Sequence, residues 1–305
     1  MSSSTRQSTS SPSTENLIRL GGVPSVPDYL RSIWERREFA LNMAAGELRS
    51  QNFDTVLGNL WHVLNPMMLV AVYFLMFGLI LGVDRGMPNF IGFLAVGIFT
   101  YSFLQKSTTS GASSIVNNLG LIRSLQFPRA LLPISSVFKE TLAYGTTLLV
   151  MVLVILVTEV QACAGDEVPA ACATFTIPVT PGWLMFVPIF GLMLFFGMGA
   201  AFITARMTDH VRDTTNFLPY LFRIAFYVSG VLYPVDRFVR EPWMKDVFNA
   251  NPFYVYVTLA RHYLMPTYTA SDLTEIWIAA LLWPPALFLF GLFYFRAREN
   301  RYGRG

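Results

Sequence analysis

The residue types that most often perform catalysis are few and scattered in this chain. It has only three histidines, His62, His210 and His262, and they fall in different segments. The sequence contains no HExxH zinc motif, no GxSxG nucleophile motif and no GxxxxGK[ST] phosphate loop. We therefore predict that the chain is not itself an enzyme, and that any ATP hydrolysis it uses is performed by another subunit.

The acidic residues do not build a convincing metal site either. Asp209 and Asp213 stand one helical turn apart, but arginines flank them, so a charged turn is the better interpretation and no metal is predicted. A membrane glycosyltransferase that uses a polyprenyl-phosphate donor is an alternative function. It would need metal-binding acids at the membrane edge, and the apolar spans offer few: Glu140, Glu159 and Glu275.

The segment from residue 119 to residue 139 could contact a partner protein. Its cations and prolines are Arg123, Pro128, Arg129, Pro133 and Lys139, and no acid occurs before Glu140. It lies between two apolar stretches, and its prolines break it into a short helix, a turn and the start of the next span. A basic, proline-interrupted segment of this kind is typical of a surface that a soluble partner can push.

Arg223 and several aromatic residues could line a path through the protein. Arg223 lies inside an apolar stretch, where a charge is costly unless it faces a pore or a partner, or reaches the membrane surface. If it is functional, it would contact an anionic group such as a pyrophosphate. Aromatic rings stack on sugar faces, although such residues often simply face lipid. The candidate rings share helix faces in two spans: Tyr73 and Phe77, then Phe217, Tyr220 and Tyr227.

Composition indicates which elements must hold these residues. Hydrophobic residues make up 53% of the 305 residues and charged residues 13%, against about 25% charged in soluble domains. The mean hydropathy is +0.47. Stretches of about 20 apolar residues can cross a bilayer. We predict an all-α integral membrane protein with six transmembrane helices: 57–83, 89–110, 133–158, 183–205, 217–234 and 274–295.

The lysines and arginines predict the orientation. Sixteen of the 22 fall in segments that share a side with the N-terminus, and five fall opposite. By the positive-inside rule, both termini are cytoplasmic and the protein is a multi-pass protein of the inner (plasma) membrane. The small net charge of +3 then reflects orientation, and no nucleic-acid partner is predicted.

The remaining segments divide the chain into regions. Residues 1–26 form a Ser/Thr-rich tail, predicted to be disordered, and residues 27–50 an amphipathic helix suited to lying among membrane lipid headgroups. The transmembrane domain covers 57–295, and a basic tail covers 296–305. Before the last span, residues 237–266 are semi-apolar and broken by prolines, which predicts short re-entrant helices on the outer side.

Both cysteines, Cys163 and Cys172, fall in one predicted exterior loop. Two cysteines close together in an oxidising compartment favour a disulfide. Two unpaired thiols remain an alternative that the spacing does not exclude.

Taken together, residues 27–298 resemble the permease subunit of ABC-2-type polysaccharide exporters, the family of O-antigen and teichoic-acid export permeases. The resemblance rests on short motifs in a fixed order: Arg123 with Phe127-Pro128-Arg129, Leu132-Pro133, Arg212-Asp213, Tyr233-Pro234, and Asn251-Pro252 followed by Arg261. The loop around residues 120–140 looks most like mycobacterial galactan export permeases.

The resemblance implies a homodimer bound to two copies of an ATP-binding subunit, which would hold ATP and Mg²⁺ while this chain binds no cofactor. A lipid-linked polysaccharide would pass between the two permease copies. Residues Arg123, Phe127, Pro128 and Arg129 would contact the ATPase. The outer gate would contain Trp243, Asn251, Pro252 and Arg261. A permease for drugs or lipids is the alternative within transport. A structural scaffold is a further one, but it leaves the basic segment unexplained.

Overall fold

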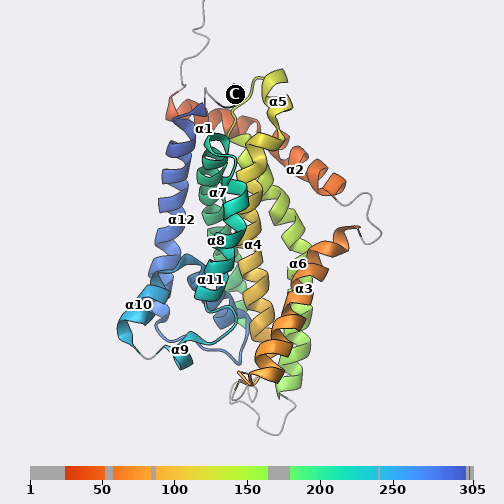
Figure 1. Ribbon diagram of the computed structural model, residues 1–305, viewed down its shortest axis with the longest axis vertical. Helices are drawn as coiled ribbons and strands as arrows, with labels where there is room; N and C mark the ends of the chain where they lie inside the picture. Colours follow the sequence, from red (N-terminus) through yellow and green to blue (C-terminus); the bar gives the residue numbers. More distant parts are fainter. Residues whose placement is uncertain are drawn as a thin grey trace, which may run out of the picture.

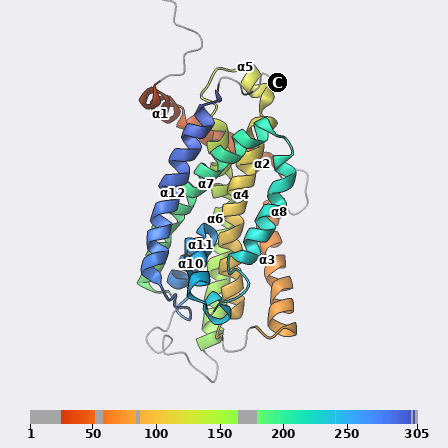
Figure 2. The same ribbon diagram turned by 60° about the vertical axis from the view of Figure 1, so that its left-hand side comes forward.

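A computed structural model describes residues 25–51, 58–83, 87–163, 179–239, 241–299 and 302. Over these residues the protein is a bundle of helices, and no strand occurs among them (Figures 1 and 2). The predicted all-α membrane class is confirmed. Residues 1–24 of the predicted tail lie outside the described residues, as do Cys172 and the side chain of Cys163, so the disulfide stays a prediction.

The bundle has two ends. The helices α1 (Val26–Glu35) and α5 (Leu119–Ser124) and the C-terminus lie together at what we call the terminal end, at the top of Figure 1. The short helices α9 (Val235–Phe238) and α10 (Pro242–Ala250) lie at the opposite end, called the loop end.

Five helical segments are long and apolar enough to cross a membrane, by length and composition. They are α3 (Trp61–Tyr73) continued by the π-helical η3 (Phe74–Ile80), α4 (Phe90–Asn117), α6 (Leu131–Cys163), the 3₁₀ turn η5 (Pro181–Met185) with α7 (Phe186–His210), and α12 (Leu273–Arg296). The first, second, third, fourth and sixth predicted spans match these segments.

The predicted fifth span is shorter than expected. Helix α8 (Thr214–Val228) has 15 residues, about 22 Å of helix against the roughly 30 Å of a hydrocarbon core. The apolar run continues to Val231 and Leu232, but Gly230 takes a left-handed conformation with φ of +58° and turns the chain. The prediction of six full-length spans is therefore wrong at this helix.

The centre of the bundle is α4, which packs against α6, α7 and the buried α11 (Pro252–Leu264). Helices α7 and α12 can approach closely because glycines lie at their contact, Gly199 on α7 and Gly291 on α12. A Cβ at Gly199 would lie 2.5 Å from the backbone carbon of Leu287, and one at Gly291 would lie 2.4 Å from the Gly199 oxygen. The backbones of α7 and α12 are thus in direct contact.

The predicted single amphipathic helix is two helices. Helix α1 ends at Glu35, and α2 (Arg37–Gln51) continues after a break at Arg36. Trp34 is exposed with the Arg37 guanidinium 5.3 Å from its ring centre, an arrangement suited to a membrane surface. Helix α2 packs along α6, where Lys139 pairs with Glu47 at 3.6 Å.

Candidate functional site

The predicted partner-contact segment protrudes at the terminal end as α5 and the turn that follows it (Figure 1). Arg123 and Leu125 are exposed there. Phe127, which the sequence nominates as the apolar contact, is instead half-buried against Phe39 of α2, with ring centres 5.4 Å apart. The exposed apolar side chain of this turn is Leu125, two residues after Arg123, which the sequence analysis did identify.

Arg129 is held by the protein's own C-terminal segment. Its backbone N–H donates to a Glu299 carboxylate oxygen at 2.8 Å, and its guanidinium donates to the Glu299 backbone carbonyl. Arg36 of the α1–α2 break donates to the Gln126 carbonyl at 2.9 Å. Pro128 lies between these two anchors and is half-buried. The predicted contact segment is therefore hydrogen-bonded both to the break between α1 and α2 and to the segment after α12.

The described part of the basic tail packs on the bundle. Tyr302 is fully buried, its ring packs tilted against that of Phe295 with ring centres 4.7 Å apart, and its hydroxyl donates to the Phe295 carbonyl at 2.6 Å. Tyr29 of α1 is also buried, with the Arg296 guanidinium 5.5 Å from its ring. Burial raises the pKa of the Glu299 carboxyl above its usual range, although hydrogen bonding to Arg129 opposes this. Sequence reasoning did not predict this cluster of buried tyrosines, because it described the C-terminal tail only by its basic charge.

Helix α8 carries most of the predicted channel residues. One narrow stripe of it is buried, Thr214, Leu218, Phe222 and Phe226, and it faces α4, where the Tyr101 hydroxyl donates to the Phe222 carbonyl. The other side chains of the helix are exposed, apart from the half-buried Ala225, and the helix runs along one edge of the bundle in Figure 2. Phe217, Tyr220, Arg223 and Tyr227 all lie on exposed positions.

The structure brings the two predicted aromatic groups together where α3 meets α8. Tyr73 contacts Phe77 and Phe226, with ring centres 6.2 and 5.4 Å away, and Phe226 contacts Tyr227 at 5.7 Å. The Tyr73 hydroxyl is close enough to Tyr227 and Arg223 to interact with both. Tyr73, Phe77, Arg223 and Tyr227 thus form one strip, with Phe226 between them, and Phe217 and Tyr220 are exposed on the same helix, α8. Its role in transport stays a prediction.

Arg261 is a buried anchor for the loop end. It is 1% exposed and donates to three backbone carbonyls: Phe93 at 3.1 Å, Gly230 at 2.9 Å and Val231 at 2.6 Å. Its guanidinium also lies 3.4 Å from the Phe93 ring centre. It therefore joins α11 to α4 and to the turn after α8. The sequence analysis placed Arg261 in an exterior segment, so the lysine and arginine count used to predict orientation included one cation that is buried.

The other predicted gate residues occupy different surroundings. Asn251 caps α11 by accepting from the Phe253 N–H at 3.0 Å, and its amide donates to the Ser229 hydroxyl at 3.3 Å. Pro252 is the first residue of α11, a position that needs no N–H donor. Trp243 on α10 is exposed. Of the four, Trp243 is exposed, Asn251 and Pro252 are half-buried and Arg261 is buried, and the gate role stays a prediction.

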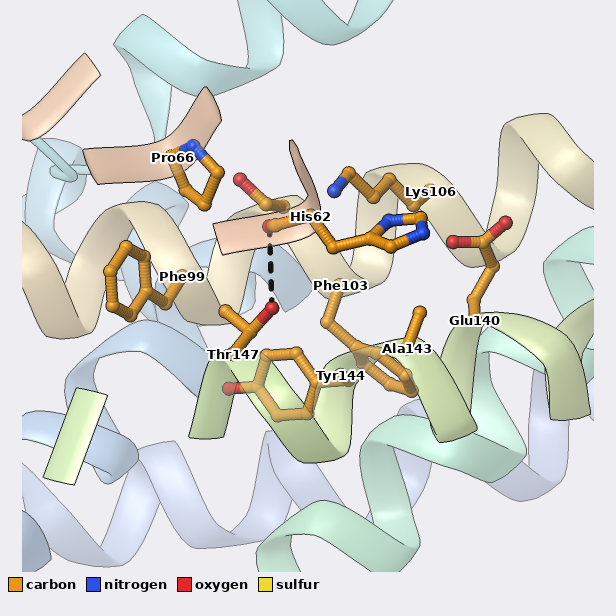
Figure 3. Close-up of a pocket in the computed structure, with 10 residues that line it drawn as sticks. His62, Pro66, Phe99, Phe103, Lys106, Glu140, Ala143, Tyr144 and Thr147 are labelled. Carbon is orange, nitrogen blue, oxygen red and sulfur yellow. Dashed lines mark hydrogen bonds between the residues drawn. The ribbon is translucent and has the colours of Figure 1, made fainter. Parts of the chain in front are cut away.

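A polar pocket lies between α3, α4 and α6 (Figure 3). The His62 ring lies near the side chains of Lys106 and Glu140, and the His62 carbonyl accepts from the Thr147 hydroxyl at 3.4 Å. The cavity is about 10 Å³, room for about one ordered water, so it is a polar contact between helices and not a substrate site. No sequence pattern signals this contact, because the three residues lie on separate spans.

The described residues contain no group of three His, Cys, Asp or Glu side chains that could hold a metal ion. Asp209 and Asp213 are separated by the end of α7, and Asp213 precedes α8. The arrangement consists of an anchored surface at one end, an aromatic strip with one cation along the side, and a buried clamp at the other end.

Comparison with known proteins finds relatives among bacterial envelope proteins. The chain is 26% identical over 193 residues to the O-antigen export system permease protein RfbA of Klebsiella pneumoniae, covering 62% of this chain and 66% of that protein. It is 25% identical over 225 residues to RfbA of Myxococcus xanthus, covering 73% and 78%. It is 23% identical over 260 residues to the polysialic acid transport protein KpsM of Escherichia coli, covering 83% and 91%. The match thus spans slightly less than two thirds of the Klebsiella relative.

The family model for the membrane domain of ABC-2 type transporters matches residues 41–265, from within α2 to just past α11. That domain contains no ATPase and binds no cofactor itself, in agreement with the sequence analysis. The match covers well over half of the chain, and the protein therefore belongs to the ABC-2 type transporter family.

Proposed function

We propose that the chain is the permease subunit of an ATP-driven exporter that moves a lipid-linked cell-envelope polysaccharide across the inner membrane. Family membership supports transport, and the names of the relatives, which export O-antigen or transport polysialic acid, support a polysaccharide. We propose galactan as the polymer, on the resemblance of the loop at residues 120–140.

In this proposal the terminal end faces the cytoplasm. The predicted excess of lysine and arginine on that side supports the orientation. Two copies of an ATP-binding subunit would dock there, on α5 with Arg123 and Leu125. Because Arg129 ties the turn after α5 to Glu299 and Gln126 ties it to Arg36, a push on α5 would reach both the segment after α12 and the amphipathic helices.

The observation that carries the proposal is the exposed face of α8. A cation such as Arg223 is costly against lipid, and a helix of 15 residues bearing it along an exposed strip needs cover by protein or water. A second copy of the chain would supply that cover, with the channel between the two copies. Aromatic rings contact sugar faces without the many hydrogen bonds that would trap a polymer, so the glycan can slide.

The first test concerns the motor contact. Leu125→Glu or Arg123→Glu is expected to abolish most ATP-dependent glycan export in proteoliposomes that contain the permease and its ATP-binding subunit. The physical reason is that a carboxylate replaces an apolar or cationic contact at an exposed position. Arg49→Glu, an exposed charge reversal at the end of α2, is the matched control and should export normally. Normal export by both α5 variants would refute this docking surface.

The second test concerns the strip on α3 and α8. Tyr220→Ala and Tyr227→Ala are expected to shift exported glycan toward short chains while the ATPase subunit stays bound, measured by gel analysis of the exported polymer. Arg223→Ala should lower substrate-stimulated ATPase activity more than basal activity, because the carrier's anionic group loses its partner. Phe293→Ala, an exposed ring on α12, is the control. Full-length export by a combined Tyr73, Tyr220 and Tyr227 alanine variant would exclude this conduit.

A further inference from the structure

A second cavity lies at the loop end, apart from the aromatic strip. It has a volume of about 220 Å³ and lies between the start of α4, the turn that begins α9 and the connection from α11 to α12. Sites for drug-sized ligands occupy about 300–1,000 Å³, so this cavity has room for one small ring and not for a chain. The lining residues that matter here are Asn89, Phe93, Asp236, Thr267, Tyr268 and Thr269.

The floor of the cavity is held by a buried carboxylate. Glu159 is fully buried, and its Oε1 accepts from the Asn89 amide at 3.0 Å and from the Thr267 hydroxyl at 2.7 Å. Asn89 in turn caps α4 by accepting from the Gly92 N–H at 2.8 Å. Glu159 Oε2 has no hydrogen-bond partner among the described residues. Two lining side chains are therefore fixed in place before any ligand arrives.

The wall of the cavity combines oxygen atoms with aromatic surface. The Asp236 carboxylate accepts from the Ser271 hydroxyl at 2.9 Å and lies 3.7 Å from the Lys245 ammonium, so it is oriented but remains exposed. Thr269 is also exposed. Tyr268 packs beside Phe93 with ring centres 5.8 Å apart, and both line the cavity. A carboxylate that can accept from hydroxyls beside an aromatic surface suits a ligand with polar edges and apolar faces.

We propose that this cavity binds one neutral sugar residue of the polymer as the glycan leaves the channel; the proposal rests on the proposed polysaccharide export and on its orientation. The Asp236 carboxylate accepts from sugar hydroxyls, and the half-buried Tyr268 contacts the ring face, while the buried Phe93 packs against Tyr268. Arg237 also lines the cavity, so its charges are mixed. The hydroxyl acceptors and the ring surface, rather than net charge, favour a neutral sugar over an anionic carrier group.

The experiment uses the permease bound to its ATP-binding subunit in nanodiscs, with short radiolabelled galactan oligosaccharides as the probe. The wild-type complex should bind them saturably. Thr269→Trp places a large ring in the cavity from an exposed position and should weaken binding at least about tenfold, or about 1.4 kcal/mol. Asp236→Asn keeps the shape but removes the charge, and it should weaken binding less. Val247→Trp, an exposed α10 residue that does not line the cavity, is the control and should bind as wild type.

Export by the same complexes separates this inference from the proposed function. Saturable wild-type binding that is lost in Thr269→Trp and kept in Val247→Trp supports the cavity. Absence of wild-type binding, or unchanged binding by Thr269→Trp, overturns it, while ATP-driven export of the full polymer by the wild type leaves the exporter assignment intact. Failure of the wild-type complex to export any polysaccharide refutes the proposed function instead.

Discussion

Replacing Arg261 by methionine is expected to destabilise the protein by about 3 kcal/mol or more and to abolish export. Methionine approximates the volume but leaves the Gly230 and Val231 carbonyls without a donor in a site that water does not reach, and it removes the second bond to the Phe93 carbonyl, which lies within α4. Each buried unsatisfied carbonyl costs about 1–3 kcal/mol. Methionine also removes the cost of burying a charge, but that gain does not replace the hydrogen bonds that the backbone carbonyls lose. Thermal unfolding of the purified protein in detergent measures the loss.

Two variants sharpen this prediction. Arg261→Lys keeps the charge but has a single nitrogen in place of the planar fork, so its stability should fall between that of wild type and Arg261→Met. Lys245→Ala removes a cation from the partly exposed pair with Asp236 and should cost under about 1 kcal/mol. If Arg261→Met unfolds at the wild-type temperature and exports glycan, the clamp does not hold the loop end together.

Enlarging Gly199 is expected to separate α7 from α12. A Cβ there would lie 2.5 Å from the Leu287 backbone carbon and 2.6 Å from the Phe288 nitrogen, and backbone atoms cannot swing aside as a side-chain tip can. Gly199→Ala should cost about 1–3 kcal/mol through overpacking, and Gly199→Leu should cost more. Thermal unfolding and the yield of monodisperse protein on size-exclusion chromatography measure the effect.

The matched control lies on the same helix. A Cβ added at Gly191 on α7 would meet no other atom within 4 Å, so Gly191→Ala should be neutral or stabilising by up to about 1 kcal/mol. Equal behaviour of Gly191→Ala and Gly199→Ala would show that helix propensity, and not the α7–α12 approach, governs the response.

The apolar runs were sufficient to predict five membrane-spanning helices, because a bilayer requires about 20 consecutive apolar residues whatever their neighbours. The same reasoning failed at α8. Hydropathy continues past Val228, and only the positive φ of Gly230 and the bonds from Arg261 to Gly230 and Val231 turn the chain there. The break between α1 and α2 at Arg36 was missed because the helical periodicity continues across it.

The candidate site was predicted in part. Tyr73 and Tyr227 lie near each other within one chain, although they are 154 positions apart in sequence, and their role in a path between two copies stays a prediction. An aromatic ring such as Phe127 is a favourable contact residue in general, but Phe39 already covers it and leaves Leu125 exposed instead. Arg129 was predicted to contact a partner, which stays a prediction, and the structure adds that Glu299 holds it. A sequence shows which residues can make a contact but not which contacts are already made.

The sequence alone determined that this chain lies in a membrane, contains no phosphate loop and carries a basic segment between two spans, because these properties depend on local composition and spacing. Tertiary structure decided the rest. It buried Arg261 among three carbonyls, exposed Arg223 on a helix too short to cross, and joined Glu159 to Asn89 and Thr267 beneath a cavity. The physical reason is that the cost of a polar group in a membrane protein depends on which distant backbone or side chain meets it, and only packing sets that.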